Sequence, residues 1–517
     1  MIKIYDTTLR DGAQMEGLSF TLNDKLKIAQ YLADFGIDFI EGGYIGSNPK
    51  DDEFFKKAKD LNLNDSKIVA FCATHHKSIK PQDDKSFNKI LELGLKHACI
   101  FGKTWDIHAE KILGITQEQN LSLIQNSVSY LADQGVEIFF DAEHFFDGYI
   151  HNPDFAIKCL KSAFEAGASN ITLCDTNGGM MPSQVFKITE EVKSFFTESG
   201  ISLGIHAHND TGMAEANSIE ATRAGADLIQ GTINGFGERT GNTNLCVIIP
   251  NLALKMQQEL NSRIDLKNLT SLANSVSETA NTSSPSRAPY VGKKSFTHKA
   301  GVHASAVQKL PESYEHIDPI KIGNIRNITV SELSGKSNIL INARKLGMDL
   351  DNNPELTQEI LRKVKQMEEQ GFAFEGADAS FALLLKRMQQ GYVQSFKLID
   401  YLVLDRGSRK EVEAEVQIQT GDEIKTAIDF GNGPVNALDK ALKKCLVNIF
   451  PNIKKVQLSD YKVRILDSKS ATGAITRVLI ESKCGQSTWI TAGSGENITR
   501  ASLNALTDSL EYFLLNS

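Results

Sequence analysis

The sequence predicts an α/β protein with a (β/α)8 TIM barrel, followed by helical linker subdomains and a C-terminal α+β domain. Three observations predict this organisation. Apolar, β-rich runs alternate with amphipathic helical stretches over the first half of the chain. The middle of the chain reads as mostly helical, and towards its end alternating apolar and polar residues indicate half-exposed strands. We therefore expect domains at residues 1–265, 266–395 and 396–517.

The predicted barrel strands are near-continuous apolar runs, which are typical of parallel strands covered on both faces. The stretches between them have apolar residues every three or four positions and end in Gly, as helices do. An open doubly wound sheet is the alternative, but eight such units match a closed barrel better. The runs are IKIY (2–5), IDFIEG (37–42), IVAFCA (68–73), HACIFG (97–102), VEIFFD (136–141), NITLCD (170–175), SLGIHAH (202–208) and ADLIQGT (226–232).

The C-terminal region contains a weak internal repeat. Two segments each read as a strand, a G-x-G and an amphipathic helix. They are AIDFGNGPVNALDKALKKCL and WITAGSGENITRASLNALTDSL. The repeat predicts a compact domain built from two related halves.

Composition excludes several classes of function. The net charge is -8 and there is no strongly basic block, so nucleic acid and anionic membrane surfaces are poor candidate partners. We find no secretory signal and no apolar run long enough to span a membrane. The seven cysteines are scattered singly, which is typical of reduced thiols in a cytoplasmic protein.

The sequence predicts a metal site at one rim of the barrel. His206 and His208 are separated by one residue on a predicted strand, so both side chains point to the same face. Asp11 follows the first strand, which neighbours the eighth in a closed barrel. Two imidazoles and a carboxylate leave open positions on a divalent ion, and Mn²⁺, Mg²⁺, Co²⁺ and Zn²⁺ all suit such ligands. Asn242 is a candidate fourth ligand, and the alternative is that the histidines only pack.

Other polar residues are candidates for substrate binding and catalysis. Arg10, beside Asp11, has a guanidinium that can bind a carboxylate or stabilise an enolate. Glu143 can orient substrate or move a proton, although a salt-bridged rim residue is the alternative. Thr176 can hold a substrate carboxylate or belong to a plain turn. His303, beyond the barrel, is a candidate general base, or else a structural histidine.

The motifs around these residues resemble the acyltransferase branch of the DRE-TIM metallolyases, which includes the 2-isopropylmalate, homocitrate and citramalate synthases. The resemblance covers essentially the whole chain and is carried by DTTLRDGAQ, CDTNGGMMP, IHAHNDTGMAEANS and NGFGERTGNTNL. Further segments look most like the long citramalate synthases: EGGYIGSNPKDDEFF, FGKTWDIH, FDAEHFFDGY, YEHIDPIKIGN and SELSGKSNI.

The resemblance implies a condensation of acetyl-CoA with pyruvate and water, which gives (R)-citramalate and CoA for isoleucine biosynthesis. It also implies a homodimer, and a C-terminal regulatory domain that binds isoleucine. By the resemblance, Asp11, His206 and His208 bind the metal, and Asn242 completes that site. Arg10 and Glu143 support the keto acid and the enolate, and Thr176 binds the keto-acid carboxylate. His303 transfers the proton together with Tyr314.

Several alternatives stay open at this stage. One is a synthase of the same branch that uses a larger 2-keto acid, as 2-isopropylmalate and homocitrate synthases do. Another is a retro-aldol lyase or a biotin-dependent carboxyltransferase subunit on the same barrel. A third is a non-catalytic amino-acid sensor, which the intact set Arg10, Asp11, His206 and His208 disfavours.

Overall fold

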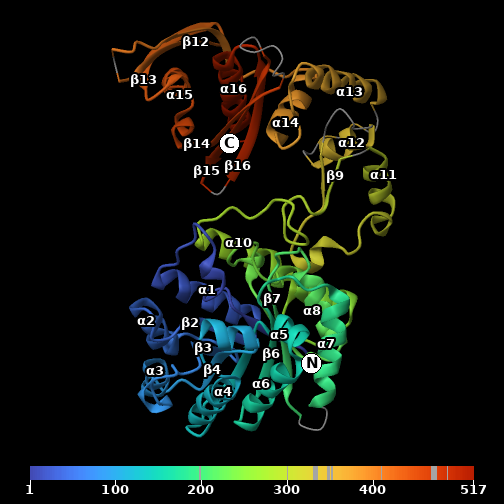
Figure 1. The fold of residues 1–517 in the computed structure, drawn as a ribbon. Helices are drawn as coiled ribbons and strands as arrows, with labels where there is room; N and C mark the ends of the chain where they lie inside the picture. Colours follow the sequence, from blue (N-terminus) through green and yellow to red (C-terminus); the bar gives the residue numbers. More distant parts are fainter. Residues whose placement is uncertain are drawn as a thin grey trace. The chain divides into compact units, whose positions relative to one another are not determined.

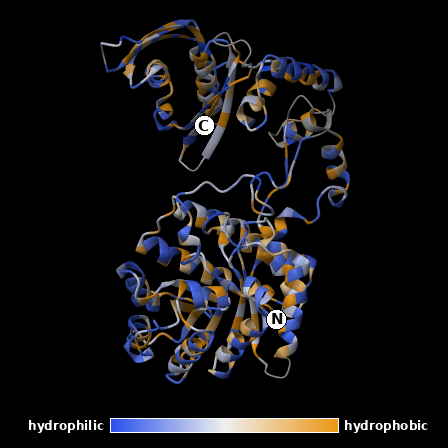
Figure 2. Cartoon of the chain, viewed as in Figure 1, coloured by the Kyte–Doolittle hydropathy of each residue, from blue (hydrophilic) through white to orange (hydrophobic). Residues whose placement is uncertain are grey.

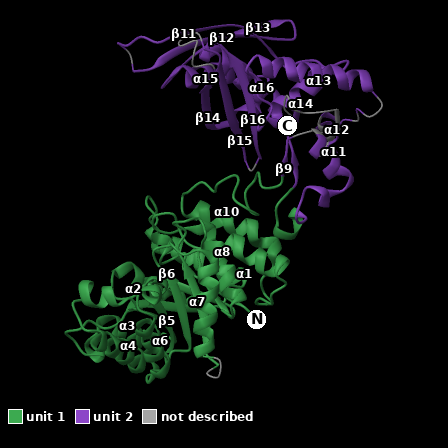
Figure 3. Cartoon of the chain, turned by 45° about the vertical axis from the view of Figure 1, so that its right-hand side comes forward, with its two compact units in different colours: residues 1–296, 319–325 green, residues 297–318, 326–517 purple. Residues whose placement is uncertain are grey.

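The structure is a computed structural model that divides into two compact units (Figure 3). Unit 1 comprises Met1–Phe296 with Pro319–Ile325, and unit 2 comprises Thr297–Asp318 with Arg326–Ser517. The domain boundaries expected near residues 265 and 395 remain predictions. The described residues are 1–196, 200–299, 301–329, 336–345, 348, 350, 353–408, 410–466, 474–485 and 487–516.

Unit 1 contains a closed barrel of eight parallel strands among its described residues, numbered in chain order (Figure 1). The barrel closes between its first and last strands, where Ile4 lies opposite Ile229. The predicted (β/α)8 barrel is therefore confirmed. The strands are β1 (Lys3–Asp6), β2 (Phe39–Tyr44), β3 (Lys67–Ala73), β4 (His97–Lys103), β5 (Glu137–Glu143), β6 (Asn170–Asp175), β7 (Ser202–Ala207) and β8 (Leu228–Gly231).

The barrel is covered by helices, most of which carry both hydrophilic and hydrophobic residues, as their mixed colouring shows (Figure 2). In the first helix a capping box joins Thr21 and Asp24, and Gly36 ends the helix with φ 100°. Among the described residues, no helix is both long enough and apolar enough to cross a membrane. The helices are α1 (Leu22–Phe35), α2 (Pro49–Lys57), α3 (Lys85–Glu92), α4 (Gln117–Ala132), α5 (Phe145–His151), α6 (Pro153–Glu165), α7 (Pro182–Phe195), α8 (Ala214–Arg223), α9 (Leu245–Pro250) and α10 (Leu269–Thr279).

The linker region of unit 2 is mainly helical, which confirms the prediction for this part of the chain. Two short strands, β9 (Thr297–His298) and β10 (Asn327–Ile328), pair beside it. The buried Glu315 carboxylate accepts hydrogen bonds from His298 and Arg326 and so ties both strands together. The helices are α11 (Gly301–Lys309), α12 (Lys336–Lys345), α13 (Pro354–Glu369) and α14 (Asp378–Arg387).

The C-terminal part of unit 2 consists of two similar halves, each a three-stranded antiparallel sheet followed by a helix. Both sheets have a register shift at the same place, before Asp400 in one half and before Asp460 in the other. The predicted α+β domain is therefore confirmed. The halves are β11 (Lys397–Leu404), β12 (Val412–Thr420), β13 (Glu423–Gly431) and α15 (Pro434–Leu446), then β14 (Gln457–Ile465), β15 (Thr476–Cys484), β16 (Ser487–Gly495) and α16 (Ile498–Asn516).

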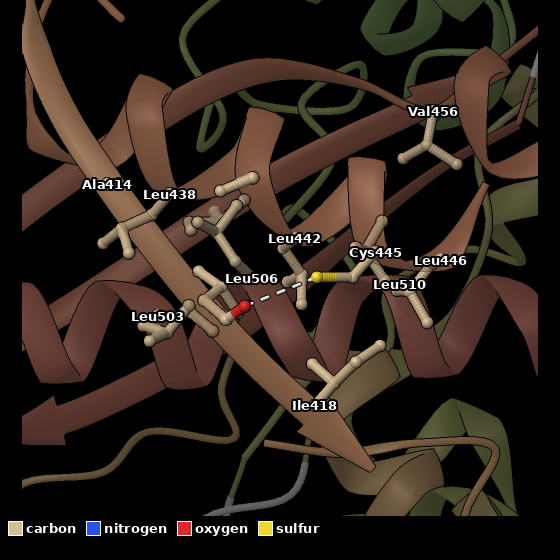
Figure 4. Packing of buried hydrophobic residues seen from close by; sticks show 14 of the residues in the cluster. Ala414, Ile418, Leu438, Leu442, Cys445, Leu446, Val456, Leu503, Leu506 and Leu510 are labelled. Atoms are coloured by element: carbon tan, nitrogen blue, oxygen red, sulfur yellow. Dashed lines mark hydrogen bonds between the residues drawn. The ribbon is translucent and has the colours of Figure 1, made fainter. Parts of the chain in front are cut away.

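The two halves share one hydrophobic core (Figure 4). Leu442 of α15 and Leu506 of α16 are both buried in it, together with Ile418 of β12. The thiol of Cys445 points to the Val416 carbonyl oxygen at 3.4 Å. Because each buried leucine contributes about 1.5–3 kcal/mol, neither half is expected to fold stably without the other.

Candidate active site

A cavity of about 580 Å³ lies at the carboxyl ends of the barrel strands. The barrel brings together six side chains that the sequence predicted as site residues, because parallel strands end at one rim. They all line this cavity: Arg10, Asp11, Glu143, Thr176, His206 and His208.

The centre of the site is the buried carboxylate of Asp11. Its Oδ2 lies 3.1 Å from Nε2 of His206 and 3.9 Å from Nε2 of His208. The amide of Asn242 donates to the same oxygen at 2.8 Å, while its own Oδ1 is buried with no hydrogen-bond partner among the described residues. The carboxylate and both imidazoles lie close enough together to share one metal ion. The orphaned Asn242 oxygen is a further potential ligand in the same place.

A hydrogen-bond chain fixes the orientation of His206. Its Nδ1 is 2.8 Å from Oε1 of Gln230, whose amide in turn donates to Asp141 at 2.8 Å. Since an amide oxygen only accepts, Nδ1 of His206 carries the proton and donates it. Nε2 of His206 therefore faces Asp11, where it can donate a proton to the carboxylate or, as a neutral imidazole, share a metal ion with it.

Charges around Asp11 keep it ionised. Burial raises the pKa of Asp11, but the Arg10 guanidinium and the His206 imidazole outweigh burial and hold this pKa well below its ordinary value. Burial and then the neighbouring His206 lower the pKa of His208 to about 3. An anionic Asp11 and a neutral His208 are the protonation states that metal binding requires.

Arg10 is held by a residue to which the sequence had given no role. Its Nε donates to Glu41 at 2.5 Å, its Nη1 lies 3.2 Å from Asp11, and its guanidinium lies 3.8 Å from the ring centroid of Phe71. Glu41 is fully buried within β2 and also accepts a hydrogen bond from Tyr5 at 2.8 Å. The sequence did contain a signal for Glu41, because it is an acidic residue inside an apolar run. Gln230, a polar residue in the apolar run LIQG, gave a similar signal.

Glu143 and Thr176 lie on neighbouring strand ends, and other residues hold them there. Glu143 forms an ion pair with Lys103 at the end of β4. The hydroxyl oxygen of Thr176 accepts a hydrogen bond from the backbone N–H of His144 at 2.9 Å. Arg239 donates to the Thr176 carbonyl oxygen at 2.8 Å. Both predicted residues therefore face the cavity in fixed positions.

An aromatic wall lines the cavity on the side of β2, β3 and β4. It consists of Tyr44, Phe71 and Phe101, one from each strand. The Phe71 and Phe101 rings are stacked with centroids 5.1 Å apart, and Tyr44 contacts both edge-on at 5.7 and 6.4 Å. The wall therefore presents packed aromatic surface to the cavity next to Arg10.

His303 and Tyr314 belong to unit 2 and not to the barrel unit. Both side chains are exposed, and their rings stack with centroids 4.2 Å apart. The pairing of these two residues is thus a feature of unit 2 itself.

Comparisons with known proteins cover the whole chain. The HMGL-like family matches residues 1–276, the homocitrate synthase post-HMGL domain-like family matches 290–371, and the LeuA allosteric (dimerisation) domain matches 375–514. The chain is 47% identical to an (R)-citramalate synthase of Geobacter sulfurreducens, over 100% of this chain and 98% of that protein. The corresponding enzyme of Aquifex aeolicus is 46% identical over 99% and 98%. A 2-isopropylmalate synthase of Methanocaldococcus jannaschii is 28% identical over 99% and 95%. The chain therefore belongs to the HMGL-like family and, within it, to the (R)-citramalate synthases, which are acyltransferases.

Proposed function

We propose that this enzyme condenses acetyl-CoA with pyruvate and water, giving (R)-citramalate and CoA. The observation that carries the choice of keto acid is the aromatic wall of Tyr44, Phe71 and Phe101 beside Arg10. We infer that these packed rings favour the methyl group of pyruvate over a bulkier isopropyl or carboxyethyl group.

A divalent cation is the cofactor in this proposal. Asp11, His206 and His208 would hold it, and the buried Oδ1 of Asn242 would complete or approach the ligand set. When bound, the cation would polarise the keto-acid carbonyl. The donor set suits Mn²⁺, Mg²⁺, Co²⁺ and Zn²⁺, and Arg10 supplies the remaining positive charge beside it.

The residues of the cavity orient the keto acid and stabilise developing charge. Thr176 donates its hydroxyl proton to the substrate carboxylate, because its oxygen already accepts from the His144 N–H. Arg10 stabilises the negative charge of the enolate oxygen, and Glu41 holds the guanidinium in place. Glu143, paired with Lys103, orients the substrate from the end of β5 at the same rim.

The general base in this proposal is His303. It removes a proton from the methyl group of acetyl-CoA, and the resulting enolate carbon forms a bond to the keto carbon of pyruvate. The keto oxygen takes up a proton, and water then cleaves the thioester to release CoA. Tyr314, stacked on the His303 ring, orients the imidazole.

Replacing His303 with Asn is expected to lower kcat by about 10²–10⁴-fold, the usual contribution of a general base, with little change in the KM for pyruvate. Thiol release from acetyl-CoA measures both constants. His298→Asn is the contrasting variant, since His298 bonds to Glu315 within unit 2 and is expected to affect stability more than kcat. An unchanged kcat in His303→Asn would contradict the assignment of the base.

Mixing two inactive variants tests whether His303 acts within one subunit. Asp11→Asn removes a metal ligand, and His303→Asn removes the base. If the base acts across a dimer, a mixed dimer regains one complete site, and an equal mixture recovers about a quarter of wild-type activity. No recovery assigns the base to its own subunit.

Selectivity among keto acids tests the proposed substrate. We expect thiol release with pyruvate to exceed release with 2-ketoisovalerate and 2-oxoglutarate. Phe101→Ala should shift the ratio of kcat/KM towards 2-ketoisovalerate by roughly 10-fold or more, because a pocket discriminates methyl groups by about 1–3 kcal/mol. A wild-type preference for 2-oxoglutarate or 2-ketoisovalerate would overturn the choice of pyruvate.

The C-terminal domain is proposed to dimerise the enzyme and to bind isoleucine. Its match to the LeuA allosteric (dimerisation) domain supports this role, and the helix N-termini that begin α15 and α16 offer N–H groups to a carboxylate. Isoleucine is expected to inhibit thiol release, and leucine to inhibit less. Removal of residues beyond 395 should abolish the inhibition. If isoleucine leaves the full-length enzyme uninhibited, the domain is not an isoleucine-binding domain.

A further inference from the structure

Three aromatic rings pack together just after strands β4 and β5, and the proposed chemistry uses none of them. Trp105 and His108 follow β4, and His144 follows β5. The rings of Trp105 and His108 are nearly parallel, at 16°, with centroids 5.2 Å apart. His144 lies 4.2 Å from His108 and 5.9 Å from Trp105. These three residues are called the Trp–His–His stack below.

His144, which lies between β5 and α5, has an unusual backbone conformation. With φ 58° and ψ 33° it lies in the left-handed region, which residues with a β-carbon seldom adopt. Such a conformation persists only when the surroundings enforce it. The ring of His144 is largely buried and packs against His108, so a residue of the loop after β4 holds His144 in place.

The conformation of His144 decides where its N–H points. That N–H donates to the Thr176 hydroxyl oxygen at 2.9 Å. The Thr176 hydroxyl lines the cavity, and once its oxygen accepts this bond its proton is directed away from His144. The orientation of the Thr176 proton therefore depends on the backbone of a residue that the stack clamps.

The loops that follow β4 and β5 are joined by further contacts. The Glu143 carbonyl oxygen accepts hydrogen bonds from the backbone and the hydroxyl of Thr104, at 3.1 and 2.8 Å. A β-carbon at Gly148 would clash with the Thr104 carbonyl oxygen, so α5 lies directly on the loop after β4. Asp147 accepts from Asn177 at 2.9 Å, which extends the connection to the residue after Thr176.

Stability alone does not account for these residue types. Among the described residues, two ring nitrogens of the stack are buried with no hydrogen-bond partner, Nε1 of Trp105 and Nδ1 of His108, while Nδ1 of His144 lies 3.7 Å from the Asp147 carboxylate. Buried polar atoms without partners destabilise a fold, and apolar rings would fill the same volume without this cost. Polar rings retained at such a cost are characteristic of sites where function constrains the sequence.

We propose that the Trp–His–His stack is a positioning device for the keto acid. It holds His144 in its left-handed conformation, so that the His144 N–H fixes the Thr176 hydroxyl with its proton towards the keto-acid carboxylate. The proposal rests on the proposed role of Thr176 in binding that carboxylate. The stack acts through Thr176 and does not touch the substrate.

A double-mutant cycle between Trp105 and Thr176 tests the proposal, since the stack is proposed to act through the hydroxyl of Thr176. Trp105→Ala is expected to raise the KM for pyruvate and its Kd roughly 10-fold, the effect of one misplaced hydrogen bond, with kcat changed less than about 3-fold. In a Thr176→Ala background the same change should add less than about 2-fold. An equal effect of Trp105→Ala in both backgrounds would overturn the proposal.

Two further variants separate positioning from general loss of structure. Trp105→Phe keeps a flat ring and is expected to restore the KM, and an unchanged Tm in Trp105→Ala would show that its raised KM does not come from loss of structure. Tyr149→Phe alters α5 outside the stack, where it removes only a bond to Glu191, and should leave both constants unchanged. Near-UV circular dichroism and Tm report folding of every variant.

The failure of this proposal is distinguishable from the failure of the proposed function. A wild-type enzyme that releases no CoA with pyruvate would contradict the proposed function. The double-mutant cycle is therefore also carried out by calorimetry, in the presence of Mg²⁺ and without acetyl-CoA. The quantity measured for each variant is the Kd of whichever keto acid the wild-type enzyme binds. Additive effects on that Kd would overturn the positioning role whatever the outcome of the turnover assay.

Discussion

The variant Asp11→Asn is expected to lose metal binding and to lower kcat/KM by about 10³-fold or more, since charge stabilisation by a bound metal contributes several kcal/mol. Asp11 is the residue on which the site converges, because His206, His208, Asn242 and Arg10 all lie around its Oδ2. The amide has nearly the same shape as the carboxylate, so the change removes charge without creating a cavity. Calorimetric titration with Mn²⁺ and thiol release measure the two losses.

A control for this variant is Asp34→Asn, which makes the same substitution on the exposed surface of α1. It should bind Mn²⁺ and turn over as the wild-type enzyme does. In Asp11→Asn the buried Arg10 keeps its partner Glu41, so the Tm is expected to stay close to that of the wild-type protein. Full activity of metal-stripped Asp11→Asn would show that the proposed metal centre is not needed for turnover.

Replacing Arg10 with Lys is expected to lower kcat by about 10²–10³-fold, as the loss of a fixed donor to a developing oxyanion does. The two residues have the same charge, but a lysine has no planar fork to bind Glu41 and Asp11 at once. It also loses the packing of the guanidinium on Phe71. Because Asp11 and the histidines remain, the Kd for Mn²⁺ should change much less than kcat.

Two further variants help to interpret the effect of Arg10→Lys on kcat. Glu41→Gln keeps the side-chain shape but weakens the hold on Arg10, and is expected to cost about 10–100-fold, as changes to residues that orient a metal site do. Arg223→Lys makes the matched change in an exposed ion pair with Glu220 and should be silent. If Arg10→Lys retained wild-type kcat, geometry at this position would not matter and the oxyanion role would be wrong.

Much of the barrel was predictable because its signals are local. The eight apolar runs fall on β1 to β8 with differences of only a few residues at their ends. The spacing of His206 and His208 and the position of Asp11 after β1 predicted their convergence, since a parallel barrel places all strand ends at one rim. The comparisons confirm the expected (R)-citramalate synthase family, whose motifs were recognisable in the sequence.

Other features depend on contacts between residues far apart in the chain, which no local pattern encodes. The partner of Arg10 is Glu41, 31 residues away, and His206 is oriented by Gln230. The roles proposed for Glu143, Thr176, His303 and Tyr314 remain predictions, although the structure supplies contacts for each.

By itself, the sequence determined the barrel, its eight strands, the Asp11, His206 and His208 set, and the domain with two similar halves. Each of these features follows from the periodicity of apolar residues or from the residue types at strand ends. Both can be read from the sequence because they do not depend on how side chains pack. Only the tertiary structure decided that Glu41 holds Arg10, that three packed aromatic rings line the cavity, and that the His144 N–H bonds to the Thr176 hydroxyl. These depend on side-chain packing between different strands, where distances of a few ångströms decide the chemistry and sequence spacing carries no information.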